Sequence, residues 1–557
     1  MFPGALERRI QYLVLFCVVS MTLIVTPWIS LDPINSPKFL VLGTCGFAVL
    51  GNLFPYLKRL IDSDARFLFY AVLLFLISLV ASFLSSDSGK WQQLFGVYGR
   101  NTGLIAYLSL SLILLATVFV TNFSFARKLI WSLTATGIFN AIYGMVQWSG
   151  NDPINWNNRY NSILGTLGNP NFVSAHLGIS GIAALSLGLE KSRNVVSRVI
   201  LLGSVGLSFF VAFQSDSSQG LYIFVFGAVI VLYFRFLKPF HFLIKSSYWT
   251  LIATSLICGI LGVLNKGPLA SRLYETSVTL RGDYWRAGWK MTADNPFFGV
   301  GLDSYGDWYR ASRGQSVVLR VGPEVTSNSA HNVFLDMSSS GGFFLLFSYL
   351  LIITIILRSC WRILSRIQNF DSIGVALVSA WLAYLIQSSI SINQLGLAIW
   401  GWALGGSIIG YDLCKDGVDV PRVKERIARK PEQVPAAVVL TGTLGVFFGF
   451  LVSVWPAAQD INFRKALETG SVIEIEDAVN HFPRNNYYLV FASNLLQQSN
   501  FEEKALTLAK RATVENPRDF NAWKILAANP KIGDADKLIA IQKMRELDPF
   551  NMTLRQS

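Results

Sequence analysis

The stretch FLFYAVLLFLISLVASFLS, residues 67–85, decides the fold class, because it is apolar throughout and contains no charged residue. An apolar segment of about 20 residues is long enough to cross the hydrocarbon core of a bilayer as a helix. Similar segments recur along the 557-residue chain, in which 52% of residues are hydrophobic and 15% are charged. A soluble protein carries about a quarter charged residues. The sequence therefore predicts an all-α, polytopic membrane bundle.

We predict about 13 membrane spans from the apolar segments between charged loops. The first segment is long and lacks a cleavage site, so we interpret it as a span and not as a removable signal peptide. The predicted spans are 11–30, 37–55, 67–85, 103–121, 129–148, 172–189, 199–214, 219–234, 248–265, 339–357, 373–391, 394–411 and 436–456.

Lysine and arginine are distributed unequally between the two ends of these spans. The N-terminus and the segments that follow even-numbered spans are rich in basic residues, whereas the short loops at the other end hold only Lys38, Lys90, Arg100 and Arg159. Basic loops stay in the cytoplasm. We therefore predict a multi-pass protein of the plasma membrane with a cytoplasmic N-terminus and an extracytoplasmic C-terminal tail.

The net charge of +13 has a simple explanation in this arrangement. Most basic residues face the anionic leaflet of the lipid bilayer, which is the expected partner of such loops. Dispersed charges of this kind do not indicate nucleic-acid binding. The five cysteines are scattered in or beside spans without ligand spacing, so we expect neither a disulfide nor a metal site.

The last hundred residues differ from the rest, because from Ala457 onward the chain is charged and helix-patterned. Pro483, Pro517 and Pro549 are spaced 34 and 32 residues apart. A 34-residue helix–turn–helix period is typical of the tetratricopeptide repeat. We expect residues 457–557 to form a small extracytoplasmic helical-repeat domain, which would pack on the membrane domain or bind a protein partner. A plain helical tail is the alternative.

One hydrophilic segment interrupts the membrane domain of residues 1–456 at positions 266–338. Polar groups at a membrane boundary are costly unless they serve a water-filled cavity, so we expect this loop to carry the chemistry. Arg281 lies in it, and a guanidinium can hold phosphate with a bidentate fork. Arg286 follows five residues later, which on a helix turns it about 140° away from Arg281. The alternative for both is an arginine that pairs with lipid headgroups.

His331 lies where this loop re-enters the membrane, between the polar SNSA and the apolar VFLDM. Its ordinary pKa is near the working pH, so it is suited to take a proton from a hydroxyl nucleophile. A capping or structural histidine is the alternative.

Two further segments at the outer ends of spans are polar. The turn GTLGNPNFVSAHL, 165–177, contains Asn169, Asn171 and His176, whose side chains are suited to hydrogen-bond a sugar. The turn FQSDSSQG, 213–220, joins two apolar helices. Polar backbone at membrane depth is tolerated where it lines a cavity or is buried in protein, so each turn is either part of a cavity or a simple loop.

Together these residues resemble a known family. The residues Arg281, Trp285, Asn295-Pro296, Gly299, Gly301, Tyr305, Ala330-His331-Asn332 and Gly342, with the GNPN turn at 168–171, are similar to the signature of bacterial O-antigen ligases and O-antigen polymerases. The resemblance covers about residues 100–410 and does not separate ligases from polymerases.

The resemblance implies an all-helical, GT-C-like glycosyltransferase of the cell envelope that needs no metal and no cofactor. Its donor would be a glycan on a polyprenyl pyrophosphate, and its acceptor a hydroxyl of a glycan, lipid or protein, with inversion at the anomeric carbon. Arg281 would stabilise the leaving pyrophosphate and His331 would position or deprotonate the acceptor. Arg286 and Asn332 would be secondary contacts.

The chain departs from the family at one turn. Where many relatives have Ser-Arg-Gly, this chain has Ser215-Asp216-Ser217-Ser218-Gln219-Gly220. Gln219 and the serines, or Arg100 or Arg159 from another outer loop, would then bind the phosphates in place of that arginine.

Two other classes of function remain open at this point. A transporter or flippase of lipid-linked sugars would use the same basic cavity without forming a bond, although no inverted repeat is evident. A catalytically inactive scaffold is the third alternative, because of the missing arginine. Neither the sugar nor the linkage follows from the sequence.

Overall fold

The computed structural model describes residues 4–63, 65–156, 163–263, 266–267, 276–414 and 434–554. Over these residues the chain is all helical, as the sequence predicted, and no strand occurs among them. Arg159 lies outside the described residues.

The helices of the first two thirds are α1 (Gly4–Leu23), α2 (Asn35–Leu53), α3 (Leu57–Ile61), α4 (Arg66–Ser85), α5 (Lys90–Phe95), α6 (Leu104–Val120), α7 (Phe123–Trp148), α8 (Pro170–Gly188), α9 (Val195–Gln214), α10 (Gln219–Leu232), α11 (Phe242–Val263), α13 (Thr276–Asp294), α14 (Tyr305–Ser312), α15 (Gln315–Val321) and α16 (Val333–Arg366). They are followed by α17 (Ser372–Ile390), α18 (Leu395–Leu413), α19 (Ala436–Thr469), α20 (Val472–Asn480), α21 (Asn486–Gln498), α22 (Glu502–Glu515), α23 (Phe520–Ala528) and α24 (Asp534–Leu547).

Nine helices among the described residues are long and apolar enough to cross a membrane. They coincide with nine of the predicted spans, in α2, α4, α7, α8, α9, α10, α16, α17 and α19. The predicted spans 11–30, 103–121, 248–265 and 394–411 overlap α1, α6, α11 and α18, which are helical but are not among the nine. The larger count of spans therefore stays a prediction.

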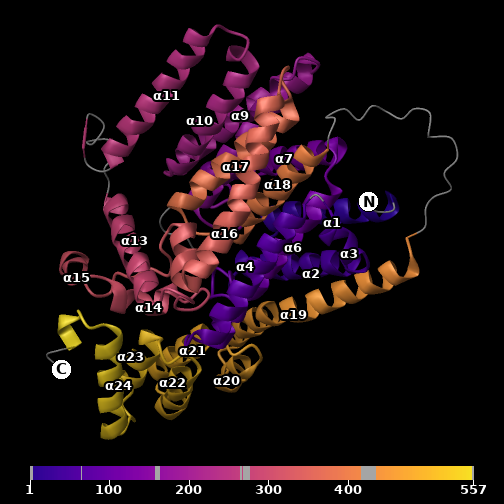
Figure 1. Ribbon diagram of the computed structural model, residues 1–557. Helices are drawn as coiled ribbons and strands as arrows, with labels where there is room; N and C mark the ends of the chain where they lie inside the picture. The colour runs from indigo at the N-terminus through magenta and orange to yellow at the C-terminus, as the bar shows by residue number, and fades with distance from the viewer. Residues whose placement is uncertain are drawn as a thin grey trace.

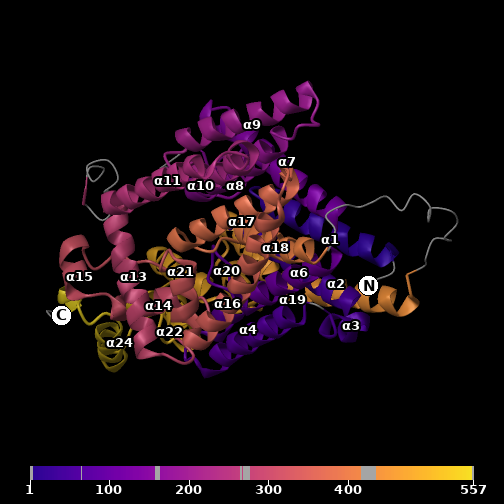
Figure 2. The same ribbon diagram turned by 45° about the horizontal axis from the view of Figure 1, so that its top comes forward.

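The bundle has a buried centre and an apolar outer surface. Most residues of α8, α17 and α18 are buried. Figure 2 shows α16, α17 and α18 in the middle, with α4 on one side and α9, α10 and α11 on the other. The outer helix α9 exposes Val195, Val196 and Val199. An exposed apolar stripe of this kind is the surface that a lipid bilayer covers.

The helix α16 is broken close to the predicted start of its span at residue 339. Gly341 and Gly342 leave the helical conformation, and Gly342 has a φ of 65°. The loop after α13 fills the break, because the Val300 N–H donates to Ser339 O (2.8 Å) and the Phe343 N–H donates to Pro296 O (2.7 Å). Backbone groups freed by the break are thus satisfied by protein at this depth, as an apolar environment requires.

Gly299 of the Asn-Pro-Phe-Phe-Gly-Val-Gly loop and Gly342 of α16 lie where two stretches of backbone approach each other closely. Gly299 has a φ of 66°, and a Cβ there would lie 2.4 Å from the backbone nitrogen of Gly341. A Cβ on Gly342 would lie 2.4 Å from the carbonyl carbon of Phe297. The two backbones approach more closely than any side chain permits, so these motif residues serve packing.

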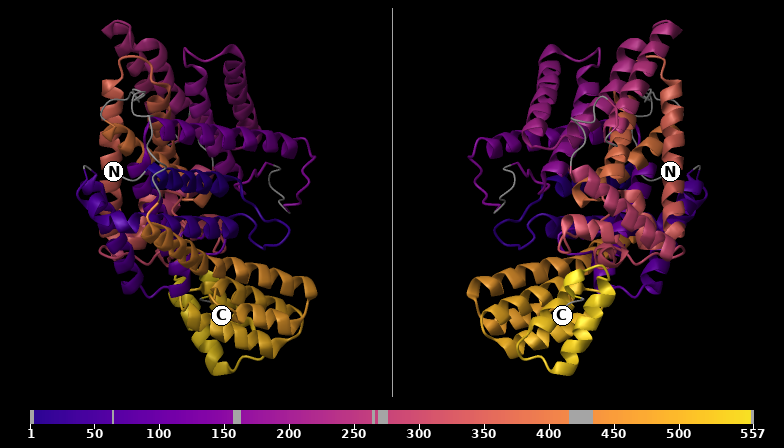
Figure 3. Two further views of the ribbon diagram at one scale, coloured as in Figure 1. Left: turned by 90° about the vertical axis from the view of Figure 1, so that its right-hand side faces the viewer. Right: turned by 90° about the vertical axis from the view of Figure 1, so that its left-hand side faces the viewer.

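The tail is a set of short helices that follows a helix shared with the bundle. The expected boundary at 456/457 lies inside α19, which runs through Pro456 to Thr469. Figures 1 and 3 show α20 to α24 on the side of the bundle where α14 lies, and α24 contacts α14. The assignment of the tail to tetratricopeptide repeats stays a prediction.

Candidate functional site

His331 lies at the end of an extended segment and just before α16. Its φ is 53°, in the left-handed region that few residues other than glycine adopt. The conformation is held by the buried carboxylate of Asp336, which accepts hydrogen bonds from Ser329 Oγ (2.8 Å) and from the Ala330 N–H (2.8 Å). The His331 N–H in turn donates to Ser329 Oγ (3.0 Å). Asp336 therefore fixes the backbone from which the imidazole projects.

The imidazole of His331 packs on one face of α13. It stacks on the ring of Tyr284, with 5.4 Å between centroids and 26° between planes. Ala330 packs against Gly288, one turn further along the same face. Arg281 precedes Tyr284 by three residues and so belongs to this face as well. The two predicted catalytic residues are thus brought together by α13.

Burial and the charge of Arg281, with a smaller effect of Arg100, lower the pKa of His331 from its ordinary value of 6.5 to about 4. Each cause disfavours the imidazolium. At physiological pH the imidazole is therefore neutral, and one of its ring nitrogens carries no proton.

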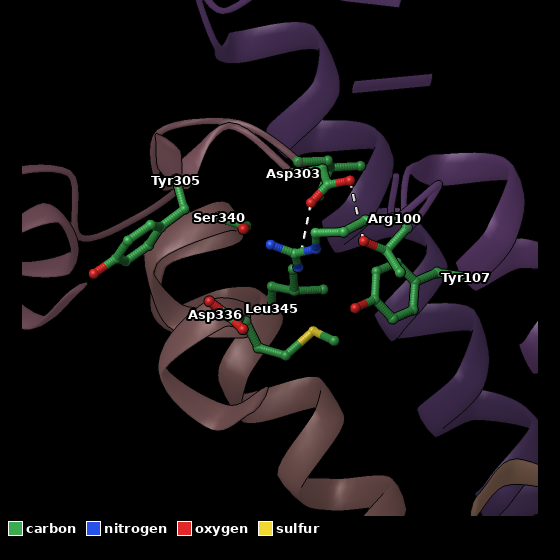
Figure 4. A pocket seen from close by; sticks show the side chains of 10 residues that line it. Arg100, Tyr107, Asp303, Tyr305, Asp336, Ser340 and Leu345 are labelled. Carbon is green, nitrogen blue, oxygen red and sulfur yellow. Dashed lines mark hydrogen bonds and ion pairs between the residues drawn. The ribbon is translucent and has the colours of Figure 1, made fainter. Parts of the chain in front are cut away.

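Arg100 lies on the inner side of this segment, in a small polar pocket (Figure 4). Its Nη1 donates to Asn328 O (2.5 Å), and its Nη2 lies 3.3 Å from Asp303 Oδ1. The pocket has a volume of about 20 Å³, which is room for a water molecule and not for a sugar. These contacts favour a structural role for Arg100 over the predicted contact with phosphate.

Arg286 lies on the other face of α13 from Arg281, as the spacing predicted. It forms an ion pair with Asp283, and so does Arg320 of α15. The side chain of Asp283 is fully buried, whereas those of Arg286 and Arg320 are 72% and 45% exposed. One buried carboxylate thus holds two guanidinium groups at the surface beside the site.

Asn332 and Asn169 cap helices. Asn332 Oδ1 accepts the N–H groups of Phe334 (3.0 Å) and Leu335 (3.2 Å) at the start of α16. Asn169 Oδ1 accepts the N–H of Asn171 (2.9 Å) at the start of α8. Capping satisfies backbone donors that would otherwise be unpaired, so for both residues the structure gives a local reason that is independent of a substrate.

The turn that departs from the family pattern lies against the start of α8. Ser217 Oγ donates to Asn171 Oδ1 (2.7 Å), and the Gly220 N–H donates to Ser174 Oγ (3.0 Å). Gln219 is buried, and neither atom of its amide has a hydrogen-bond partner among the described residues. An unsatisfied buried amide is costly, so a polar ligand group or water at this point would be favourable.

The expected position of His176 at an outer surface is wrong. The residue is fully buried inside the bundle, where its ring lies 6.3 Å from that of Trp400. The polar pattern of the turn before α8 did not reveal that its second helical turn lies at the centre of the bundle.

Several residues of the site were missed by the sequence argument. Tyr284 contacts the ring of His331, and Asp336 holds the backbone before it. Asp283 holds Arg286 of its own helix and Arg320 of α15 beside the site. The one signal in the sequence for these residues was the presence of acidic side chains in a loop whose arginines are suited to bind an anion.

The comparison with family models agrees with this arrangement. Residues 173–350 match the model of the family described as O-antigen ligase. The matched stretch contains Arg281, His331 and the break in α16. A comparison with curated proteins found no match to the chain. The resemblance inferred from the sequence is thus confirmed, because residues 173–350 match the O-antigen ligase family.

Proposed function

We propose that this protein is a glycosyltransferase of the cell envelope that moves a glycan from a polyprenyl-pyrophosphate donor to an acceptor hydroxyl. The observation that carries the proposal is the packing of His331 against the face of α13 to which Arg281 belongs, within the stretch that matches the O-antigen ligase family. A base and a cation that meet at one face of a helix are the two groups that such a displacement needs.

His331 serves the acceptor in this mechanism. Its neutral ring nitrogen accepts the proton of the acceptor hydroxyl while the oxygen attacks the anomeric carbon. The lowered pKa keeps the nitrogen unprotonated before the reaction. The acceptor is a hydroxyl of a glycan, a lipid or a protein.

Arg281 serves the leaving group. As the new glycosidic bond forms, the bond between the anomeric carbon and the pyrophosphate oxygen breaks, and its electron pair stays on the pyrophosphate. A guanidinium placed at that oxygen stabilises the developing charge. A single displacement of this kind inverts the anomeric carbon and calls for neither a metal nor a cofactor.

The buried amide of Gln219 is the best candidate for the role of the missing arginine. It lies on the turn that carries this arginine in relatives, and its hydrogen-bonding groups have no partner among the described residues. A neutral amide binds phosphate less strongly than a guanidinium does, so more of the charge of the donor would fall to Arg281.

The positive-inside distribution of the loops supports a reaction at the outer face of the plasma membrane. The tail and the loop with His331 would then be extracytoplasmic, and the lipid-linked donor would reach them from the outer leaflet.

A cell-based comparison tests the proposal. Full-length Arg281→Lys and His331→Asn variants, expressed in cells that lack the wild-type protein, should reach the membrane in normal amounts but leave the surface without the glycan. Lysine keeps the charge and loses the bidentate fork. Normal surface glycan from both variants would contradict the mechanism, and would favour a transporter or a scaffold.

A further inference from the structure

The tail contributes two buried contacts to the loop that ends at His331. Asp548, directly after α24, is fully buried and lies 2.8 Å from Arg313 Nη2 and 3.0 Å from Arg310 Nη1. Both arginines belong to the segment around α14, and the side chain of Arg313 is itself fully buried. Two guanidinium groups of the loop therefore share one carboxylate of the tail, and Arg310 also pairs with Glu324 (3.4 Å).

The same two arginines hold the backbone that leads to His331. Arg310 Nη1 donates to Pro323 O (2.7 Å), and Arg313 donates to Pro323 O (2.9 Å) and to Val325 O (2.9 Å). Asp548 thus acts on the segment 323–325 through the arginines that it pairs with.

Besides the ion pair of Glu324 with Lys524 of α23 (2.9 Å), the segment from Pro323 to His331 is held at three further points. The first is the pair of arginines bound to Asp548, the second is the contact of Arg100 with Asn328 O (2.5 Å), and the third is the carboxylate of Asp336 at Ser329 and Ala330. The second and third points belong to the membrane domain. The first depends on the C-terminal end of the chain.

We infer that Asp548 is a positioning residue, by which the C-terminal helices set the backbone that presents His331. The inference rests on the proposed function for the role of His331, but the placement of segment 323–331 by Asp548 can be tested without transfer. A displacement of a reacting group by about 1 Å can cost a hundredfold in rate, so a contact at one end of this segment is sufficient to affect catalysis.

The energetics of a buried pair suggest the decisive variants. Removal of Asp548 alone leaves the fully buried guanidinium group of Arg313 without the carboxylate that it pairs with, and leaves Arg310 with Glu324 at 3.4 Å, which destabilises the fold. Replacement of the whole cluster by apolar residues of similar size often restores stability. However, the combined replacement Arg310→Met, Arg313→Met and Asp548→Leu removes the hydrogen bonds to Pro323 and Val325 as well.

The test compares full-length proteins in nanodiscs: wild type, Asp548→Asn, the triple replacement, and Asp534→Asn as a control at an exposed acidic residue of α24. Hydrogen exchange is measured at the amides of residues 325–331, and transfer is measured as kcat and donor KM. We expect Asp548→Asn to speed exchange in this segment and to lower kcat at least tenfold with donor KM unchanged. The control should match wild type.

The triple replacement separates positioning from mere stability. We expect it to regain the melting temperature of the wild type but not its kcat, because the carbonyls of Pro323 and Val325 no longer accept hydrogen bonds from Arg310 and Arg313. Full recovery of kcat in the triple replacement, or wild-type exchange and kcat in Asp548→Asn, would overturn the inference. If the wild type transfers nothing, the proposed function fails, while the exchange result still decides whether Asp548 holds the segment.

Discussion

At the scale of single residues, His331 is constrained twice, by its backbone and by its ring. The left-handed φ of 53° is a conformation that asparagine adopts more readily than alanine does. The ring stacks on Tyr284 and lies in the field of Arg281. A substitution can therefore remove the base while it keeps the backbone, which makes the chemistry of this residue separable from its structural role.

His331→Asn should lower transfer at least about a hundredfold, the usual contribution of a general base, while the melting temperature stays close to that of the wild type. His331→Ala should lower both transfer and melting temperature, because alanine is strained at a positive φ. Transfer rates and thermal unfolding of the purified variants give both readings. An active His331→Asn protein would show that the imidazole is not the base.

The pH dependence of His331 follows from its lowered pKa. Burial and the charge of Arg281 bring the pKa to about 4, so the imidazole stays neutral as the pH falls from 8 to 5 and charges only as it approaches 4. Replacing Arg281 with glutamine removes a repelling charge, and the pKa should rise toward 6.5.

Diethyl pyrocarbonate modifies neutral imidazole, and the modified peptide is quantified by mass spectrometry. We expect modification of His331 to persist to about pH 4 in the wild type and to fall at a higher pH in Arg281→Gln. Equal midpoints in the two proteins would show that Arg281 does not act on His331.

The sequence indicated His331 and Arg281 as candidates because each is a rare polar group at a membrane boundary, and their catalytic roles stay a prediction. Asp283 and Asp336 could not be predicted. Asp336 holds the backbone at Ala330, and Asp283 holds two arginines, of which Arg320 comes from a different helix. Residue types in the sequence indicate the side chains that would contact a substrate more readily than the side chains that hold them in place.

At the scale of elements, the break in α16 is the feature that joins the loop to the bundle. The apolar pattern placed a span near residue 339, but α16 begins at Val333 and changes direction at Gly341 and Gly342. Apolar periodicity identifies a helix and its approximate length. It does not reveal a break in the helix when the backbone groups at the break form hydrogen bonds with another loop. This part of the fold could therefore not be predicted.

Gly342→Ala should destabilise the protein, because its φ is 65° and a Cβ would meet the carbonyl carbon of Phe297 at 2.4 Å. The expected cost is about 1–3 kcal/mol or more, seen as a lower melting temperature and a lower yield. Gly206→Ala in α9 is the matched control, because no atom lies within 4 Å of a Cβ there. Equal melting temperatures for the two variants would refute this account of the break.

The junction between α14 and the tail contains an acid with a perturbed pKa. Asp307 accepts hydrogen bonds from Gln92 Nε2 (3.0 Å) and Asn516 Nδ2 (3.0 Å). Burial and the charge of Asp519, only partly offset by Arg518, raise the pKa of Asp307 to about 7. A carboxyl whose pKa is raised by docking stabilises the docked state below its undocked pKa of 3.8, and this contribution is lost as the pH rises through 7.

The stability of wild type should therefore decrease relative to Asp307→Asn between pH 5.5 and pH 8, by about 2 kcal/mol. Melting temperatures of both proteins at the two pH values give the comparison, with Asp534→Asn as the control for a lost surface charge. Parallel pH profiles for wild type and Asp307→Asn would contradict the assignment.

At the scale of the whole molecule, composition and apolar length were sufficient for an all-helical protein with membrane-spanning helices, and the motif residues for its family domain. How the tail docks on the membrane domain could not be predicted, because docking depends on contacts between distant residues. Examples are the stacking of Tyr98 on Tyr487, with 3.9 Å between ring centroids, and the ion pair of Asp548 with Arg313. Such contacts join residues hundreds of positions apart, which no local pattern encodes. The membrane helices and the tail thus meet around the loop that carries His331.

The most direct test of the central claim is a transfer assay with purified protein, a polyprenyl-pyrophosphate glycan from the same cells, candidate acceptors and EDTA. Mass spectrometry would follow the transferred glycan and the released lipid pyrophosphate. We predict transfer by the wild type and none by His331→Asn. The absence of transfer by the wild type, together with movement of the lipid-linked glycan across the leaflets of proteoliposomes, would contradict the account and identify a transporter.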